Sequence, residues 1–160
     1  MEGLPNKRTL FVDLDGVLAD FDGGFPAKFG VDHRSMLDAD MWAKIHADDF
    51  FFRDLPPCPG ALAFFSKIRQ YKPVILTACP TEHYIKVATQ KREWVRGHLG
   101  DAIFVLPCQG GKHKQLFMHR HGDILIDDFV RNVQRWHGAG GSGILHTNFK
   151  DTWEQLEEYL

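Results

Sequence analysis

Two aspartates separated by one leucine follow the first apolar run of the chain. Asp13 and Asp15 come at the end of the apolar run Thr9–Val12, which is expected to form a buried strand, and Gly16 can bend the backbone directly afterwards. Alternation along a strand predicts that both carboxylates point to the same side. Carboxylates this close repel one another and lose hydration, so a fold retains them when a cation or a reaction uses them. A solvated turn at a strand end is the alternative.

A second pair of acids ends a later apolar run. Asp127 and Asp128 close the run that begins at Ile124. If both runs are parallel strands of one sheet, four carboxylates meet at its carboxyl edge, where open α/β sheets bind ligands. Oxygen ligands without a neighbouring cysteine or histidine favour a hard cation, above all Mg²⁺. We therefore predict Mg²⁺ as the cofactor, with Asp13, Asp15, Asp127 and Asp128 as its candidate residues.

Hydroxyl and ammonium groups stand near the same predicted edge. Thr77 ends a third apolar run and is placed to donate a hydrogen bond to a phosphoryl oxygen, although threonine at a strand end is usually structural. A glycine-rich loop then leads to Lys112 and Lys114. One of these lysines could neutralise an anionic ligand, and at least one must be a solvated helix end. Beside four acids, these groups favour a phosphate ligand.

Strand-like and helical segments alternate along the chain of 160 residues. The predicted strands are Thr9–Leu14, Pro73–Ala78, Ala102–Leu106, Ile124–Asp127 and Gly143–His146. The predicted helices are Gly60–Tyr71, Thr81–Leu99, Lys112–His121, Val130–His137 and Thr152–Leu160, the last with Asp151 as its N-cap. This order indicates an α/β fold with a doubly wound, mostly parallel, Rossmann-like sheet. The length suits one domain with a sizeable core.

Residues 19–59 break this alternation and contain no convincing core strand. The segment is rich in aromatic residues and ends at the proline-rich stretch 56–60. An insertion of this length exceeds an ordinary βα loop, so we predict a small helical cap, with residues 1–18 and 60–160 as the core. Most of its aromatic side chains should form the cap's own core, with two or three facing the ligand. The candidates for that substrate pocket are Phe21, Phe25, Trp42 and Phe51.

Composition and charge exclude several classes of protein. A formal net charge of −2 argues against a general binder of nucleic-acid polymers. No apolar run approaches the length of a membrane span, and residues 1–8 lack the apolar core of a signal peptide. Three cysteines without a CxxC spacing favour reduced thiols in a cytoplasmic protein. A homodimer is compatible with the sequence, which does not fix the oligomeric state.

Two patterns that suggest other sites are discounted. Gly138–Gly143 satisfies G-x-G-x-x-G, but it follows a predicted helix and precedes a strand, the reverse of the dinucleotide-binding order. We predict a loop there. His119 and His121 have no cysteine or acid near them that completes a zinc site.

Taken together, the motifs resemble those of the haloacid dehalogenase superfamily of phosphohydrolases. The residues that carry the resemblance are Asp13-Leu14-Asp15-Gly16-Val17, then Thr77, a lysine, and Asp127-Asp128. Further segments resemble the 5′(3′)-deoxyribonucleotidase family, its bacterial and phage members in particular: 13–21, 23–25, 50–52, 57–61, 91–95 and 125–128. The resemblance covers residues 9–146 in order and implies a haloacid dehalogenase-like core with a helical cap after the first strand.

The resemblance also implies a reaction. A Mg²⁺-dependent phosphomonoesterase would act on (deoxy)nucleoside monophosphates, with Asp13 as the nucleophile that becomes an aspartyl-phosphate. Asp15 would protonate the leaving hydroxyl and then activate water. The cation would bind the Asp13 carboxylate, the Asp15 backbone carbonyl and Asp127, with Asp128 acting through water or orienting the other ligands.

Phosphate contacts are implied for one hydroxyl and for lysines. Thr77 and the motif lysine would hold phosphoryl oxygens. Lys114 fits the family's Lys-x-x-aromatic spacing better than Lys112, and Lys91 matches another family lysine that approaches phosphate. Ala78 departs from the family, which often has a second hydroxyl there.

Three other functions stay open on the sequence. A phosphatase of the same superfamily could act on another small phosphoester, such as a sugar phosphate, and a panel of substrates would reveal that preference. A phosphotransferase would pass the phosphoryl group to an alcohol. A non-catalytic module that binds phosphate or metal is disfavoured because Asp15 is present.

Overall fold

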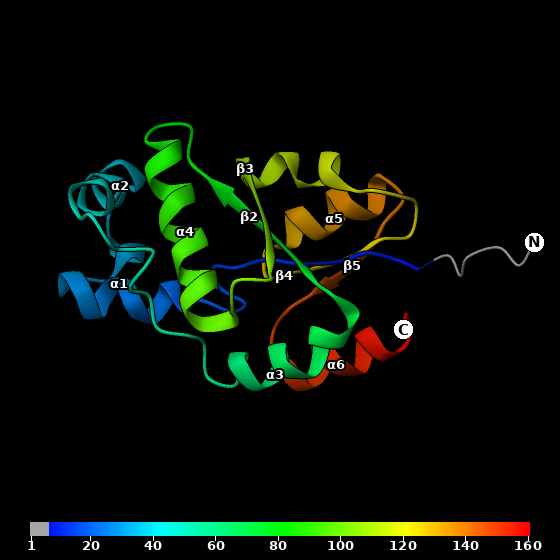
Figure 1. The fold of residues 1–160 in the computed structure, drawn as a ribbon. Coiled ribbons are helices and arrows are strands. Elements are labelled where there is room, and N and C mark those ends of the chain that lie inside the picture. The colour runs from blue at the N-terminus through cyan, green and yellow to red at the C-terminus, as the bar shows by residue number, and fades with distance from the viewer. Residues whose placement is uncertain (1–6) are drawn as a thin grey trace, which may run out of the picture.

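The centre of the molecule is a parallel sheet, which the computed structural model shows within its described residues, 7–160 (Figure 1). In chain order the strands are β1 (Leu10–Val12), β2 (Val74–Cys79), β3 (Phe104–Gln109), β4 (Ile124–Asp127) and β5 (Ser142–Leu145). They form one five-stranded sheet in the order β3-β2-β1-β4-β5, with every neighbouring pair parallel. The predicted doubly wound α/β fold is confirmed. We expected residues 1–8 to lack the apolar core of a signal peptide. Residues 1–6 of that stretch lie outside the described chain.

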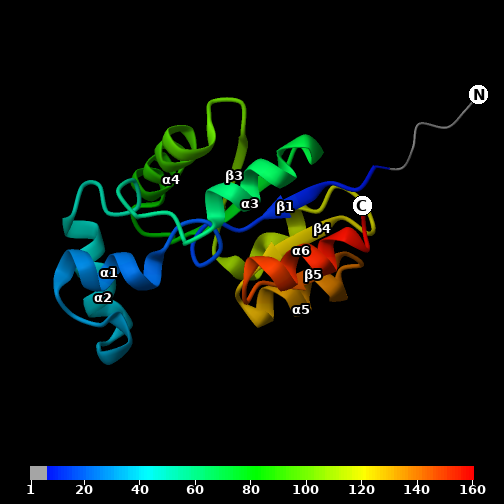
Figure 2. The same ribbon diagram turned by 90° about the horizontal axis from the view of Figure 1, so that it is seen from below.

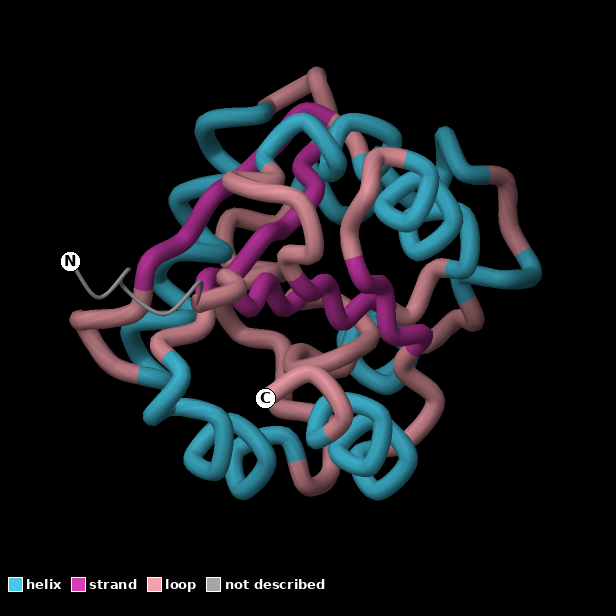
Figure 3. The backbone as a smooth tube through the Cα atoms, turned by 90° about the vertical axis from the view of Figure 1, so that its right-hand side faces the viewer, coloured by secondary structure: helices cyan, strands magenta, loops and turns pink. Residues whose placement is uncertain are grey.

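Helices cover both faces of the sheet (Figure 3). Alternate residues of β1 point to opposite faces, so Leu10 and Val12 join one apolar cluster while Phe11 joins the other. The first face is covered by α3 (Ala61–Ile68), α4 (Tyr84–Leu99) and α6 (Phe149–Glu157), and the second by the 3-10 segment η3 (Gly111–Phe117) and by α5 (Val130–Gly138). Within residues 7–160, the helices are too short or too polar to cross a membrane.

The central strand β1 lies where the chain changes direction across the sheet. The chain builds outward from β1 to β2 and β3, then crosses back to place β4 on the other side of β1. In doubly wound sheets this reversal leaves a crevice at the carboxyl ends of the two central strands, where ligands bind. The register pairs Val12 with Ile126, so the residues that follow these strands come side by side.

β1 ends at Val12, two residues before the predicted end. The Asp13 N–H still donates to the carbonyl of Ile126, at 2.9 Å, but the chain then turns, and the Gly16 N–H donates to the Ala19 carbonyl. Asp15 therefore lies in the turn beyond the strand, so strand alternation does not determine the side to which its carboxylate points.

The other strands lie close to their predicted positions, except β3. Strand β4 has the predicted bounds, and β2 and β5 are displaced by one residue at each end. β3 begins later than predicted and continues through Pro107. Because β3 is an edge strand, a residue without an N–H is tolerated there.

Several helix boundaries differ from the predicted ones, and α4 begins at Tyr84 instead of Thr81. The predicted helix Lys112–His121 is the 3-10 segment η3, and the end of the helix predicted at Gly60–Tyr71 is a second 3-10 segment, η2 (Arg69–Tyr71). α6 begins at Phe149, and its N-cap is Asn148, whose Oδ1 accepts the Asp151 N–H at 2.8 Å. The prediction of Asp151 as the cap is wrong, because an asparagine one turn earlier satisfies that N–H.

Residues 19–59, which we call the cap segment, lie at one end of the molecule, opposite the C-terminus (Figures 1 and 2). The segment contains α1 (Phe21–Phe29), the 3-10 segment η1 (His33–Ser35) and α2 (Asp38–Ala47). Asp20 begins α1 by accepting the Gly23 N–H on its side chain, at 2.9 Å. The helices agree with the expected helical insertion, and the division into core and cap stays a prediction.

Candidate active site

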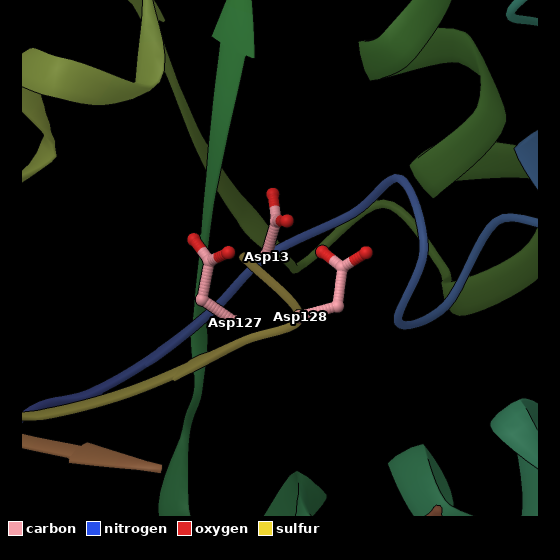
Figure 4. A group of neighbouring side chains, drawn as sticks. All are labelled: Asp13, Asp127 and Asp128. Atoms are coloured by element: carbon pink, nitrogen blue, oxygen red, sulfur yellow. The ribbon is translucent and has the colours of Figure 1, made fainter. Parts of the chain in front are cut away.

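Three carboxylates meet at the carboxyl ends of the two central strands. Asp13 follows β1, Asp127 is the last residue of β4, and Asp128 comes next. One carboxylate oxygen from each lies within 4.8 Å of the others. In Figure 4 the three side chains point toward the same space beyond the strand ends. The structure therefore brings together three of the four predicted acids.

A buried lysine lies between two of these carboxylates. Lys114 Nζ donates to Asp13 Oδ1 and to Asp127 Oδ2, both at 2.7 Å, and only 1% of the residue is exposed. Burial alone would lower the pKa of this lysine, but the two carboxylates outweigh burial and raise it. Lys112 is exposed to solvent. Of the two candidate lysines, Lys114 is the one at the acids.

The acid cluster carries unfavourable negative charge. Burial, followed by the charge of Asp127, raises the pKa of Asp13 well above its usual value, and Lys114 offsets only part of this effect. Desolvation and Asp127 also raise the pKa of Asp128, although that residue as a whole is exposed. A cation bound between the three carboxylates would remove this repulsion. Carboxylate oxygens without nitrogen or sulfur ligands fit Mg²⁺.

Asp127 is held in place by groups that sequence reasoning did not identify. Its Oδ1 accepts the Phe129 N–H at 2.9 Å, and its Oδ2 accepts Asn132 Nδ2 at 3.1 Å as well as Lys114. Asn132 lies in the first turns of α5 and is buried. The only sequence signal for it was an amide five residues after the acid, which alone does not predict a contact.

Asp15 has different partners from the other three acids. Its Oδ2 accepts Lys91 Nζ at 2.6 Å, while its Oδ1 is buried without a hydrogen-bond partner among residues 7–160. Thr77 is fully buried near the end of β2, and its Oγ1 lies 3.2 Å from Lys91 Nζ. Thr77, Lys91 and Asp15 therefore form a second polar group beside the acid cluster.

The four aromatic candidates in the cap segment fall into two pairs. Phe25 and Phe51 are 0% and 2% exposed, lie with ring centroids 5.9 Å apart, and belong to the apolar cluster that also includes Leu10 and Val12. Phe21 and Trp42 are half-buried, and Trp42 stacks on His46 with ring centroids 5.3 Å apart. In this conformation, only Phe21 and Trp42 of the four present aromatic surface to solvent.

Open space reaches the acid cluster from the side of β5. A cleft of about 590 Å³ is lined by Gly16, Cys58, Asp128 and residues 146–149. A larger cavity of about 740 Å³ lies near the amino ends of β1 and β4, away from the acids. The chemistry of the side chains, rather than cavity size, therefore locates the site.

These features define a class of protein. A doubly wound sheet with Asp13 after β1, two further acids at the end of β4 and a lysine between them is the arrangement of the haloacid dehalogenase-type phosphatases. The fold is similar to a hydrolase from Streptococcus pneumoniae TIGR4, with a TM-score of 0.54 and 13% identity over 94% of this chain and 99% of that one.

The particular family follows from sequence comparison. The model of the family "5' nucleotidase, deoxy (Pyrimidine), cytosolic type C protein" matches residues 38–155, and the chain belongs to this family. A human cytosolic-type 5'(3')-deoxyribonucleotidase is 30% identical over 143 residues, covering 74% of this chain and 69% of the relative. A mouse mitochondrial 5'(3')-deoxyribonucleotidase is 28% identical over 149 residues, covering 74% and 63%. The predicted superfamily and family are thereby confirmed.

Proposed function

We propose that this protein is a Mg²⁺-dependent phosphomonoesterase that removes phosphate from (deoxy)nucleoside monophosphates. The observation that carries the proposal is the cluster of Asp13, Asp127, Asp128 and Lys114, in a chain of the deoxyribonucleotidase family. The named relatives are deoxyribonucleotidases, and the chain spans 69% and 63% of their lengths.

The first half of the reaction uses the two aspartates of the turn after β1. The Leu14 N–H and Lys114 both bind Asp13 Oδ1, so Oδ2 is the oxygen that we assign to the attack on phosphorus. As the bond from phosphorus to the ester oxygen breaks, Asp15 donates a proton to that oxygen, and Asp13 is left as an aspartyl-phosphate. Lys114 orients Asp13. We assign to Thr77 the donation of a hydrogen bond to a phosphoryl oxygen.

The second half regenerates the enzyme. Asp15, now ionised, accepts a proton from a water molecule, which attacks phosphorus and releases inorganic phosphate from Asp13. Bound Mg²⁺, held by the carboxylates of Asp13, Asp127 and Asp128, would offset charge that develops on the phosphoryl oxygens. The backbone carbonyl of Asp15 is a further candidate ligand.

Steady-state kinetics across deoxy- and ribonucleoside monophosphates, with Mg²⁺ and a set of sugar phosphates, test the proposal. We expect kcat/KM to be highest for a nucleoside monophosphate. Asp13→Asn should abolish turnover without unfolding the protein, since the amide keeps the shape of the carboxylate but is not a nucleophile. A preference for sugar phosphates would contradict the proposed substrate class. Wild-type turnover by the Asp13→Asn variant would contradict the assignment of Asp13 as the nucleophile.

A further inference from the structure

Lys91 is the second buried lysine at the site, and its hydrogen bonds go to the protein. It lies on α4 and is 2% exposed. Its Nζ contacts Asp15 Oδ2 at 2.6 Å, the Ala78 carbonyl at 2.6 Å and Thr77 Oγ1 at 3.2 Å. An ammonium group has three hydrogens to donate, so these three acceptors use all of them.

These contacts leave the two oxygens of Asp15 in different states. Lys91 fixes Oδ2, while Oδ1 is buried and has no hydrogen-bond partner in the described chain. A buried carboxylate oxygen without a donor is costly, which is acceptable where a reacting group completes the contact. Oδ1 is therefore the Asp15 oxygen that no protein group of the described chain holds, and we assign to it the proton exchange with the leaving group.

We infer that Lys91 is a positioning residue, which holds the Asp15 carboxylate so that Oδ1 faces the leaving oxygen. The inference rests on the proposed phosphatase function. It differs from a direct contact between Lys91 and phosphate, because every ammonium hydrogen already has a protein acceptor. Lys91 thus acts on the reaction through Asp15.

The same lysine connects Asp15 to the cap segment. The ring of Phe52 lies 4.7 Å from Lys91 Nζ, a cation–π distance. The neighbouring Gln90 Oε1 accepts the Phe52 N–H at 3.0 Å, and Trp94 Nε1 donates to the Leu55 carbonyl at 2.8 Å. One face of α4 therefore fixes the last part of the cap segment against the lysine that holds the proposed acid.

The test compares two leaving groups in the same protein sample. With enzyme in excess over substrate, the release of the leaving group is measured for a nucleoside monophosphate and for p-nitrophenyl phosphate, whose phenolate departs without a proton. Lys91→Met should slow nucleoside release by about 100-fold or more, the scale of lost general acid catalysis. Nitrophenolate release should fall by less than about tenfold, because that step does not need Asp15 as an acid. The ratio of the two rates does not depend on the folded fraction.

Two further variants complete the design. Lys112→Met removes an exposed lysine from the neighbouring η3 and should change neither rate. Lys91→Arg keeps the positive charge, but its planar guanidinium cannot meet the same three acceptors, so it should show the same selective loss. If the Lys91→Met variant does not fold, the two release rates are compared in the Lys91→Arg variant instead.

Each outcome separates the inference from the proposed function. Equal falls for both substrates would mean that Lys91 acts on the phosphoryl group, and would overturn the positioning role. Failure of the wild-type protein to hydrolyse either phosphoester would overturn the proposed function itself. A selective loss with the nucleoside substrate supports both.

Discussion

At the scale of single residues, Gly16 sets how closely Asp128 approaches the turn that carries Asp15. Its φ angle is +81°, in the left-handed region that suits glycine. A Cβ at this position would lie 2.1 Å from Asp128 Oδ2 and 2.6 Å from its Cγ. A side chain at position 16 must therefore displace the Asp128 carboxyl from the acid cluster.

Gly16→Ala is expected to weaken Mg²⁺ binding, because a displaced Asp128 can no longer complete the set of ligands. The left-handed backbone adds a stability cost of about 1–2 kcal/mol. Gly30→Ala is the matched control, since Gly30 has a φ of +69° and a Cβ there would meet nothing within 4 Å, so it should show the stability cost alone. Mg²⁺ titration of activity and urea unfolding measure the two effects. Equal Mg²⁺ affinity in both variants would contradict the steric argument.

At the scale of elements, α4 serves two parts of the molecule at once. Its apolar face packs on the sheet through residues such as Val87 and Val95. Another face makes polar contacts with the cap segment through Gln90, Lys91 and Trp94. Because both faces belong to one helix, α4 fixes the position of the cap segment relative to the strand ends that carry the acids.

Gln90→Leu is expected to loosen the cap segment. It leaves the buried Phe52 N–H without an acceptor, which costs about 1–3 kcal/mol in the free energy of unfolding. The KM for the nucleotide should rise more than kcat falls, since the acids themselves are unchanged. Urea unfolding and steady-state kinetics measure this, with Thr89→Ala on the exposed side of α4 as the control. Unchanged stability would show that water replaces the lost acceptor.

What the sequence could predict at this scale depended on strong local patterns. Short apolar runs that end in acids located β1, β4 and the carboxyl edge of the sheet. Apolar runs and acidic residues can both be recognised from the order of residue types along the chain. The turn at Asp15, the 3-10 geometry of η3 and the contact from Asn132 depend on backbone geometry that the order of residue types does not specify, and the contact between Lys91 and Asp15 joins residues 76 positions apart. Sequence patterns do not predict such contacts. The role of Lys91 as a phosphate-binding residue was therefore predicted from the family resemblance alone.

At the scale of the whole molecule, the acid cluster opposes folding until a cation binds. Burial and Asp127 raise the pKa of Asp13 above its usual value of 3.8, so the folded chain binds more protons than the unfolded chain. The contribution of Asp13 to the stability of the metal-free protein therefore falls as pH rises from 3.8 toward the raised pKa. Above the raised pKa, the ionised form of Asp13 destabilises the metal-free fold.

Mg²⁺ is accordingly expected to stabilise the protein against heat. A ligand that binds only the folded state adds about 2.7 kcal/mol at a concentration 100 times its Kd. Thermal unfolding in EDTA and in increasing Mg²⁺ measures this shift, and Asp127→Asn should greatly reduce it. Asp13→Asn in EDTA should unfold at no lower a temperature than wild type, because a neutral amide relieves the repulsion. An unfolding temperature independent of Mg²⁺ in the wild-type protein would contradict the metal site.

The position of β1 has a consequence for how the protein is made. This three-residue strand is synthesised before the other strands and is the centre of the sheet, yet one of its two neighbours is β4. The Thr9 N–H reaches its acceptor, Asp123 Oδ1, across 114 residues of chain. Until those residues leave the ribosome, one edge of β1 has no partner, and an open strand edge is a template for pairing with other chains. The growing chain therefore has an open edge at β1 that the finished fold closes with β4.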